Sequence, residues 1–341
     1  MITTKGLKER WDSFKEENPK TRIRDAAKQL GVSEADLLAT QLGETVQRLE
    51  GDFRELLKEV RTLGYVMALT RNDNIVHERK GVYEKVSFRD QTGLVLGPDI
   101  DLRLFMSHWH FGFAVDENSR KSLQFFDQDG LAVHKIYLTD RSDEAAYEAL
   151  VQKYIALDQT TPIVTVSYPE KESETSGEAI DVAAFQEQWL AMQDTHEFFG
   201  LLRKHNLGRE QGIRLAPEGH SVSISVDQLK KIIETVAERD VPIMIFASSP
   251  GCIQIHTGLV KKLVSMGPWY NVLDPEFNMH LREDQISRIW VTRKPTKDGI
   301  VTGLDLFDKD GNSIALMFGK RKPGIPEMKE WQDVVNEVIA A

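Results

Sequence analysis

The apolar positions of this 341-residue chain recur first at the spacing of amphipathic helices and then alternate as in strands, and this order occurs twice. In the first half, the helical pattern covers residues 7–17, 24–30 and 51–63. Ser33 and Asp36 have the spacing of a capping box, which predicts the start of a further helix. Residues 65–138 then consist of short apolar runs separated by turn residues, so we expect strands there.

The second half follows the same plan. Helical spacing covers residues 185–205, 209–215 and 327–340. Ser225 and Gln228 have the spacing of a cap for a helix that ends near Arg239, and strands are expected over residues 242–318. In each half an Asp-Gly pair between two apolar runs, at residues 129–130 and 310–311, predicts a hairpin.

The two halves are predicted to be copies of one structural unit. Four pairs of like residues support this, two of them 177 positions apart and two 181 apart: Gly81 and Gly258, Pro98 and Pro275, Trp109 and Trp290, Gly130 and Gly311. A four-residue insertion between the proline pair and the tryptophan pair explains the change of offset. Residues that break the repeat become candidates for function, because the shared fold does not need them.

The fold class expected from these patterns is α+β with an internal structural duplication. Each half should be a largely antiparallel β-sheet with flanking helices, because its strands are consecutive and joined by turns. We expect an N-terminal repeat over residues 1–166 and a C-terminal repeat over residues 183–341. Residues 167–182 between them, which are mostly polar over 167–178, are expected to form an exposed linker.

The composition is that of a soluble globular protein, with 41% hydrophobic and 28% charged residues. A net charge of −10 argues against non-specific binding to nucleic acid or to an anionic membrane surface. The single cysteine, Cys252, excludes an intrachain disulfide and fits a reducing compartment. The N-terminal residues have no apolar signal core, and no apolar run is long enough to cross a bilayer, so we expect a cytoplasmic protein that is not embedded in a membrane.

Common catalytic motifs are absent from the sequence, which has no Gly-rich phosphate loop, no Gly-x-Ser-x-Gly and no His-Glu-x-x-His. His108 and His110 share one face of a predicted strand, but no third metal ligand lies near them in the sequence. A polar strand edge is the simpler interpretation of this pair.

His196 has surroundings that suit a metal ligand. Asp194 or Thr195 could cap a new helix and place His196 in its first turn, where the helix N-terminus disfavours the imidazolium form. Phe198 and Phe199, with the two leucines after them, would supply an apolar surround that suits haem iron. The alternative is a partly buried histidine whose ring is hydrogen-bonded within the protein.

Arg103 breaks the repeat. It lies in a strand-like run on the same face as Asp101, and the matching position 177 residues further on is His280. The fold alone therefore does not require a positive charge at this position. The alternative is an arginine that pairs with Asp101 or Asp99 at the surface of a sheet.

Three basic clusters in the second half of this acidic chain suggest a pocket for an anionic ligand. They are Arg203, Lys204 and Arg209; Arg293, Lys294 and Lys297; and Lys320, Arg321 and Lys322. Arginine and lysine side chains bind carboxylates such as the two propionates of haem. Solvated hairpin tips are the alternative, in particular for Lys297 and Lys322.

Seven stretches carry a further signal: residues 74–78, 101–105, 124–127, 194–199, 204–207, 251–255 and 290–296. Together they make the chain resemble the cytoplasmic hemin-degrading factor family of Gram-negative bacteria, of the HemS/ChuS/HmuS type, over nearly its whole length. The resemblance implies a duplicated fold that binds haem in a cleft on the C-terminal repeat. It implies that His196 is the axial iron ligand and that Arg103 reaches the distal side from the other half.

The resemblance also assigns residues around the ligand. Arg209, Lys294 and Arg321 match basic residues near the propionates. Phe318 stands where relatives often have a tyrosine near the haem, so a hydrogen bond is expected to be lost there. His77 matches a histidine implicated in a second haem site in some members.

Two functions agree with the resemblance. In the first, the chain binds haem taken up by the cell and degrades it with release of iron, Arg103 stabilises a partly anionic oxygen ligand, and an external electron donor supplies electrons. In the second, the chain is a non-enzymatic cytoplasmic haem carrier that delivers haem to a separate oxygenase. The expected partners are haem and either an inner-membrane haem ABC transporter or a downstream haem oxygenase. The sequence does not separate these two functions, because both need the same ligand and the same basic pocket.

A regulator that binds DNA is a third hypothesis. Residues 24–37 have the spacing of a helix-turn-helix, with Gly31 at the turn. The second helix would begin with Glu34 and Asp36, which are acidic where contact with phosphate needs basic residues, so nucleic acid is not an expected partner.

Overall fold

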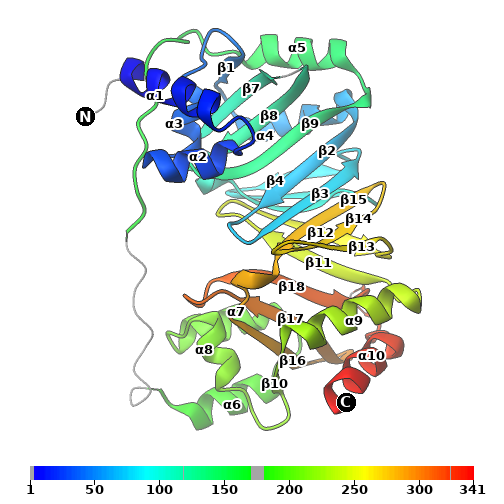
Figure 1. Cartoon of the computed structure of the whole chain (residues 1–341). Helices are drawn as coiled ribbons and strands as arrows, with labels where there is room; N and C mark the ends of the chain where they lie inside the picture. Colours follow the sequence, from blue (N-terminus) through cyan, green and yellow to red (C-terminus); the bar gives the residue numbers. More distant parts are fainter. Residues whose placement is uncertain (1–3, 118, 170–179, 323) are drawn as a thin grey trace. The chain divides into compact units, whose positions relative to one another are not determined.

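The computed structural model describes residues 4–117, 119–169, 180–322 and 324–341, and it divides into two compact units (Figure 1). Unit 1 consists of Met1–Arg71, Glu78–Glu170 and Ser248–Gln254, and unit 2 of Asn72–His77, Lys171–Ala247 and Ile255–Ala341. Each unit thus takes in a short segment from the other half of the sequence. The division into repeats at residues 1–166 and 183–341 stays a prediction, and residues 170–179 of the expected linker lie outside the described residues.

The first half of the chain supplies most elements of unit 1. Its helices are α1 (Thr4–Glu17), α2 (Ile23–Leu30), α3 (Glu34–Ala39), α4 (Phe53–Glu59) and α5 (Glu144–Tyr154), with short 3-10 turns η1 (Val60–Leu63) and η2 (Met106–His108). Its strands are β1 (Val46–Leu49), β2 (Gly64–Arg71), β3 (Ile75–Gly81), β4 (Val86–Arg89), β5 (Thr92–Leu96), β6 (Asp101–Phe105), β7 (Phe111–Glu117), β8 (Arg120–Phe126) and β9 (Ala132–Ser142).

The second half supplies most elements of unit 2. Its helices are α6 (Val182–Leu190), α7 (Glu197–Lys204), α8 (Arg209–Arg214), α9 (Val226–Glu238) and α10 (Lys329–Ala340), with the 3-10 turn η4 (Glu283–Gln285). Its strands are β10 (Ser221–Ile224), β11 (Ile243–Ser248), β12 (Cys252–Gly258), β13 (Leu263–Met266), β14 (Trp269–Leu273), β15 (Phe277–Arg282), β16 (Arg288–Thr296), β17 (Gly299–Phe307) and β18 (Ser313–Gly319). No described helix combines the length and the apolar composition needed to span a membrane.

The described strands belong to two nine-stranded antiparallel sheets. The first half of the chain contributes the runs β1-β7-β8-β9-β2-β3 and β6-β5-β4, and the second half the runs β10-β16-β17-β18-β11-β12 and β15-β14-β13. Strands β3 and β12 are each divided between the two units. The strand orders of the two halves match position by position. The predicted α+β class with an internal structural duplication is therefore confirmed.

Helices cover both faces of the main strand run in each unit. In unit 2, α9 and α10 pack on the face that carries Val291, and α6, α7 and α8 pack on the opposite face, which carries Trp290. In unit 1, α4 and α5 pack on the face that carries Leu123, and α3 packs on the face that carries Phe113. Neighbouring residues of one strand point to opposite faces, so each strand contributes to two cores.

Local capping chemistry agrees with the sequence. Oγ of Ser33 accepts the backbone N–H of Asp36, and the Asp36 carboxylate accepts the N–H of Ser33, both at 3.0 Å. Ser225 and Gln228 form the same box at the start of α9. Both predicted capping boxes are confirmed. They could be predicted because each depends only on two residues that are three positions apart.

One helix prediction needs correction, and one helix was not predicted. The stretch 185–205 is not one helix, because α6 ends at Leu190 and α7 begins at Glu197. Between them Asp194 accepts the backbone N–H of His196, which forms a turn in place of a helical hydrogen bond. Helix α5 was not expected, although Asp143 caps it by accepting the N–H of Ala146. Its buried face packs into the core of unit 1.

The two Asp-Gly hairpins form with the same turn chemistry. Asp127 accepts the backbone N–H groups of the residues two and four positions further on, at 3.0 and 2.8 Å, and Asp308 makes the same pair of bonds in the second half. Gly130 and Gly311 adopt φ angles of +76° and +73° at equivalent points of the two turns. Both predicted hairpins are confirmed.

The four-residue insertion lies in a different place from the one predicted. The β16–β17 hairpin runs from Arg288 to its partner Phe307 and is four residues longer than the β7–β8 hairpin, which runs from Phe111 to its partner Phe126. The offset is therefore 177 up to the start of β16 and becomes 181 only within this hairpin. The two tryptophans are not equivalent, because one precedes β7 and the other lies within β16.

Candidate functional site

His196 lies directly before α7 in unit 2, with its side chain 92% exposed. Its backbone N–H donates to Oδ1 of Asp194 (2.8 Å), and the same oxygen lies 2.6 Å from the ring Nδ1. Because an ionised carboxylate only accepts, Nδ1 of the neutral ring carries the proton and Nε2 keeps its lone pair. His196 is the N-cap residue of α7, one position before the predicted first turn, and its ring is exposed where the alternative interpretation had it partly buried.

Asp194 interacts with two residues of the predicted site. The hydrogen bond from the backbone N–H of His196 is the main cause that lowers the pKa of Asp194, and it outweighs a smaller opposing effect of burial. The ring of His196 and the charge of Arg321 act in the same direction. Arg321 follows β18 and is half-buried. Asp194 therefore interacts electrostatically with both His196, the candidate axial ligand, and Arg321, a candidate propionate-binding residue.

Only part of the expected apolar surround of His196 is at the surface. Phe199 is 63% exposed, and the guanidinium carbon of Arg203 lies 4.9 Å from the centre of its ring. Phe198 and the leucines at the end of α7 are buried in the core formed with α6 and α8. Phe199 is thus the ring of this group that a ligand can reach.

A buried group of charges lies on the sheet beneath α6, α7 and α8. Nε of Arg209 donates to Oδ1 of Asp305 (2.8 Å), and Nζ of Lys294 lies 3.6 Å from Oδ2 of the same carboxylate. Thr292 donates to Asp305 at 2.9 Å and accepts from Lys294 at 2.8 Å. Nζ of Lys294 also lies 4.7 Å from the ring centre of Phe198. Asp305 therefore holds two cations of the predicted site.

Burial and charge act against each other in this group. Burial lowers the pKa of Lys294 to about 8, although the negative charge of Asp305 opposes this shift. Burial also opposes the ionisation of Asp305, but the charges of Arg209 and Lys294 outweigh it and hold the pKa of the Asp305 carboxyl below its ordinary range. Lys294 is enclosed, whereas the Arg209 side chain remains 29% exposed. An anionic ligand at the surface can therefore contact Arg209 directly.

Strand pairing places Phe318 on the same face as these charges. Thr292 pairs with Gly303, and Gly303 pairs with Phe318, so the three positions form one row across β16, β17 and β18. A side chain at Gly303 would clash, because an added Cβ would lie 2.5 Å from the Phe318 ring. The ring of Phe318 therefore lies over this glycine, with Phe246 against it at 5.4 Å.

The repeat does not preserve this row. The matching row of unit 1 consists of Val115, Ser122 and Tyr137, as the strand pairings show. Gln124 occupies the position of Asp305. Unit 1 thus has an amide where unit 2 has the carboxylate that binds Arg209 and Lys294, and its own buried carboxylate, Glu34 of α3, pairs with Lys135 and Arg71 instead. The two units therefore differ in which residues carry the buried charges on this side of the sheet.

Arg103 lies in β6 of unit 1, where it forms an ion pair with Asp101, as the alternative interpretation predicted. Leu94 is its cross-strand partner, and Leu94 and Phe105 are exposed on the same face. His280 occupies the equivalent position of unit 2, opposite Asn271, and its Nδ1 lies 2.7 Å from the Asn271 side-chain oxygen. Arg103 thus stands beside two exposed apolar side chains on this face of the sheet.

Three further histidines lie away from His196 and Arg103 in their local contacts. His77 belongs to unit 2 and is buried, with its ring centre 4.9 Å from that of Phe277, on which His256 stacks at 3.7 Å. His108 interacts through Nδ1 with the Tyr168 hydroxyl at 2.9 Å. Among the described residues there is no cluster of three or more His, Cys, Asp or Glu side chains with the geometry of a metal site.

Sequence reasoning named Asp194 only as a possible helix cap and did not identify Asp305. Asp194 stands two positions before His196, and this spacing could have indicated a carboxylate that hydrogen-bonds the ring. Asp305 shows no comparable signal, because its contacts with Arg209 and Lys294 depend on strand register and on the position of α8.

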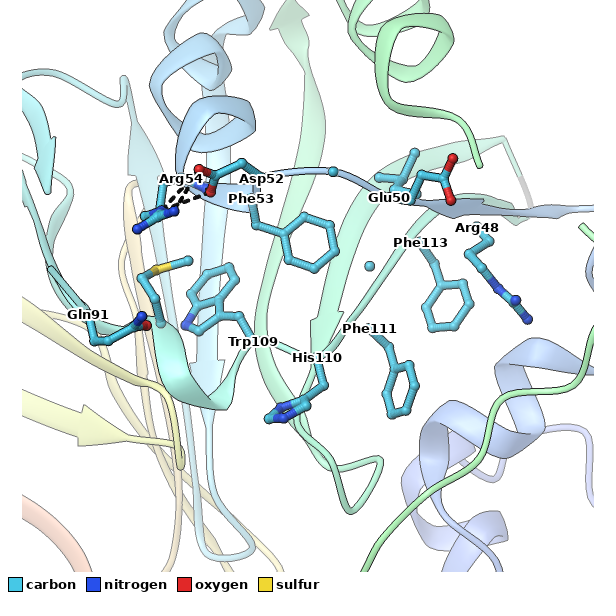
Figure 2. A pocket seen from close by; sticks show the side chains of 14 residues that line it. Arg48, Glu50, Asp52, Phe53, Arg54, Gln91, Trp109, His110, Phe111 and Phe113 are labelled. Atoms are coloured by element: carbon cyan, nitrogen blue, oxygen red, sulfur yellow. Dashed lines mark hydrogen bonds and ion pairs between the residues drawn. The ribbon is translucent and has the colours of Figure 1, made fainter. Parts of the chain in front are cut away.

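A cavity of about 650 Å³ in unit 1 contains none of the predicted site residues (Figure 2). Figure 2 shows the rings of Phe53, Trp109 and Phe113 around it, with Arg54 turned to Asp52. Arg54 binds both carboxylate oxygens of Asp52, at 2.8 and 2.9 Å. The Arg54 guanidinium is therefore already paired with a carboxylate of the protein. The residues that line the cavity are not those predicted to bind haem.

Comparisons with known proteins add to this geometry. A family model described as the haemin-degrading HemS.ChuX domain matches residues 31–154 and 206–338. The hemin transport protein HemS of Yersinia enterocolitica is 38% identical over 99% of this chain and 100% of its own length. The chain belongs to the HemS/ChuX haemin-degrading family.

Solved structures are also similar over nearly the whole chain. Holo-PhuS, a haem-binding protein from Pseudomonas aeruginosa, is 43% identical with a TM-score of 0.95, and the match covers 98% of each chain. ChuS, described as a haem oxygenase of E. coli, is 36% identical with a TM-score of 0.88, covering 98% of this chain and 99% of ChuS. Arg103 lies in the first stretch that the HemS/ChuX model matches and Arg209 in the second, whereas His196 lies between the two.

Proposed function

We propose that this chain binds haem taken up by the cell and degrades it with release of iron, with His196 as the axial ligand and Arg103 on the distal side. The observation that carries the proposal is the exposed imidazole of His196, whose Nδ1 is engaged by Asp194 while Nε2 stays available to iron. The 43% identity to haem-binding PhuS over 98% of the chain supports haem as the ligand.

The cations of unit 2 would receive the propionates. Arg209 uses Nε and one terminal nitrogen on Asp305, which leaves its other N–H donors for an anion. Arg321 would bind the second propionate in place of its present interaction with Asp194. Buried Lys294 would act through Asp305 and its positive charge, and Phe199 and Phe318 would supply apolar contact. The C-terminal repeat would thus carry the main haem site.

Arg103 would act on the distal side. Its guanidinium stands among exposed Leu94 and Phe105, a mixture of one charge and apolar surface that suits the face of a porphyrin. Degradation consumes dioxygen and electrons, so an external electron donor is required. A cation beside a partly anionic oxygen ligand would favour the reaction. This role requires Arg103 to leave or share its ion pair with Asp101.

The proposal includes a second haem site at His77, which is closed in the haem-free fold. The ring is buried against Phe277, so haem could reach it only after this contact opens. We place the whole process in the cytoplasm. An inner-membrane haem ABC transporter would be the source of haem there.

A non-enzymatic haem carrier is the second candidate function. HemS of Yersinia enterocolitica and HmuS of Yersinia pestis, which is 37% identical, are both described as hemin transport proteins. In this case the same His196 and the same cations would hold haem until a downstream haem oxygenase receives it.

One experiment separates the two functions. The purified protein is mixed with hemin, air and a reductant, with catalase present to remove free peroxide, and the Soret band and chelatable iron are followed. Loss of the band with release of iron supports degradation, whereas a stable band supports the carrier. His196→Ala should lose or strongly shift the Soret band, and His110→Ala, an exposed histidine of unit 1, is the matched control. An unchanged spectrum in His196→Ala would refute the ligand assignment.

A further inference from the structure

Asp194 makes two contacts with one residue, His196. Its Oδ1 accepts the backbone N–H at 2.8 Å and lies 2.6 Å from the ring Nδ1. The backbone bond closes the turn before α7, and the ring contact restricts the rotation of the imidazole. The Asp194 side chain is itself 50% exposed, so the fold tolerates its replacement.

The ring contact decides which nitrogen of His196 carries the proton. A neutral histidine in water prefers the proton on Nε2, and this form would block the exposed nitrogen. A carboxylate acceptor at Nδ1 favours the opposite tautomer and leaves Nε2 with its lone pair. The same hydrogen bond increases the basicity of the ring towards a metal.

We propose that Asp194 is a positioning residue for the axial ligand, which selects the Nδ1–H tautomer of His196 and strengthens donation from Nε2. This inference rests on the proposed function, in which His196 binds haem iron. The tautomer is a property of the protein without haem, so that part of the inference is tested independently.

Variants of Glu197 and of Asp194 itself provide the controls. Glu197 is a second carboxylate at the start of α7, and it accepts the backbone N–H of Gln193 at 3.2 Å. Glu197→Gln therefore removes one negative charge from the same segment without changing the acceptor at Nδ1 of His196. Asp194→Asn keeps an oxygen that can accept the backbone N–H, whereas Asp194→Ala removes the acceptor.

The first measurement uses the haem-free protein labelled with ¹⁵N-histidine. NMR correlations of the ring nitrogens at a pH where His196 is neutral report its tautomer. The Nδ1–H form should predominate in the wild type and in Glu197→Gln, and Asp194→Ala should shift the population towards Nε2–H. Equal tautomer populations in Asp194→Ala and the wild type would overturn the inference.

The second measurement uses the haem-loaded protein. Asp194→Ala should weaken haem binding by about 10- to 100-fold, lower the iron(II)–histidine stretching frequency and raise the reduction potential. Asp194→Asn should lie between it and the wild type, and Glu197→Gln should match the wild type. An unchanged stretching frequency in Asp194→Ala would contradict a role towards iron. If His196→Ala leaves the haem spectrum unchanged, the proposed function fails, while the NMR result on the tautomer stands.

Discussion

The ammonium group of Lys294 lies 3.6 Å from Oδ2 of Asp305, and both side chains are buried in unit 2. The same carboxylate binds Arg209, so one acidic residue on the sheet balances two cations. A buried ion pair adds little stability relative to an apolar pair of similar size, because removing two charges from water is costly. Asp305 also fixes the position of the partly exposed Arg209 guanidinium.

Asp305→Asn should destabilise the protein strongly. Lys294 would then be buried without its counter-charge, and such a loss typically costs about 3–5 kcal/mol of unfolding free energy. Urea unfolding followed by circular dichroism measures the change. Asp333→Asn, which breaks the exposed pair with Lys329, is the control and should cost less than about 1 kcal/mol. Equal losses in the two variants would contradict this account of the buried group.

Glu327 should make stability depend on pH. Its Oε2 accepts the N–H of Thr302 at 2.8 Å, and burial raises the pKa of Glu327 from 4.5 to about 7. Between these values the folded state keeps a proton that the unfolded chain has lost. The stabilising contribution is therefore complete below about pH 4.5 and disappears as the pH rises through 7.

Glu327→Gln should remove this dependence. Unfolding midpoints of the wild type and the variant, measured from pH 4 to about 8, should change relative to each other mainly within the window from 4.5 to 7. Parallel curves throughout would show that Glu327 does not titrate in this range.

Arg103→Ala should retain haem but slow its degradation. His196 and the cations of unit 2 are unchanged in this variant, so the haem affinity should stay within a few-fold of the wild type. Loss of a charge that stabilises a partly anionic ligand should lower the turnover rate on the order of 100-fold. Arg282→Ala is the matched control, because Arg282 also pairs with an aspartate two positions away, Asp284. Identical rates in the two variants would remove Arg103 from the site.

Gly130→Ala should be more destabilising than Gly311→Ala. Both glycines have positive φ, which costs about 1–2 kcal/mol for alanine. At Gly130 the new Cβ would also lie 2.1 Å from Oγ of Ser33, which caps α3, whereas at Gly311 it would lie 3.9 Å from Oε2 of Glu210, an ordinary van der Waals distance. We expect a loss of about 2–5 kcal/mol for Gly130→Ala. Thermal unfolding of the two variants tests this, and a larger loss at Gly311 would be contrary to the packing argument.

Some of the fold could be predicted because the causes are local. Ser33 and Asp36 form their capping box, and each Asp-Gly pair forms its hairpin, through atoms within four residues of one another. The place of the insertion was predicted wrongly. A tryptophan at both positions 109 and 290 suggested that these positions are equivalent. The strand register between Arg288 and Phe307 shows instead that the extra residues lie in a hairpin.

In the candidate site, too, some features follow from the local sequence and others depend on the tertiary structure. The sequence by itself determined which residue types break the repeat, among them Arg103 against His280, and it placed Asp194 two positions before His196. Only the tertiary structure decided that Lys294 is enclosed, that Asp305 holds it together with Arg209, and that the His196 ring is exposed. The physical reason is that burial and ion pairing depend on strand register and helix packing between segments far apart in the chain, which local spacing does not encode.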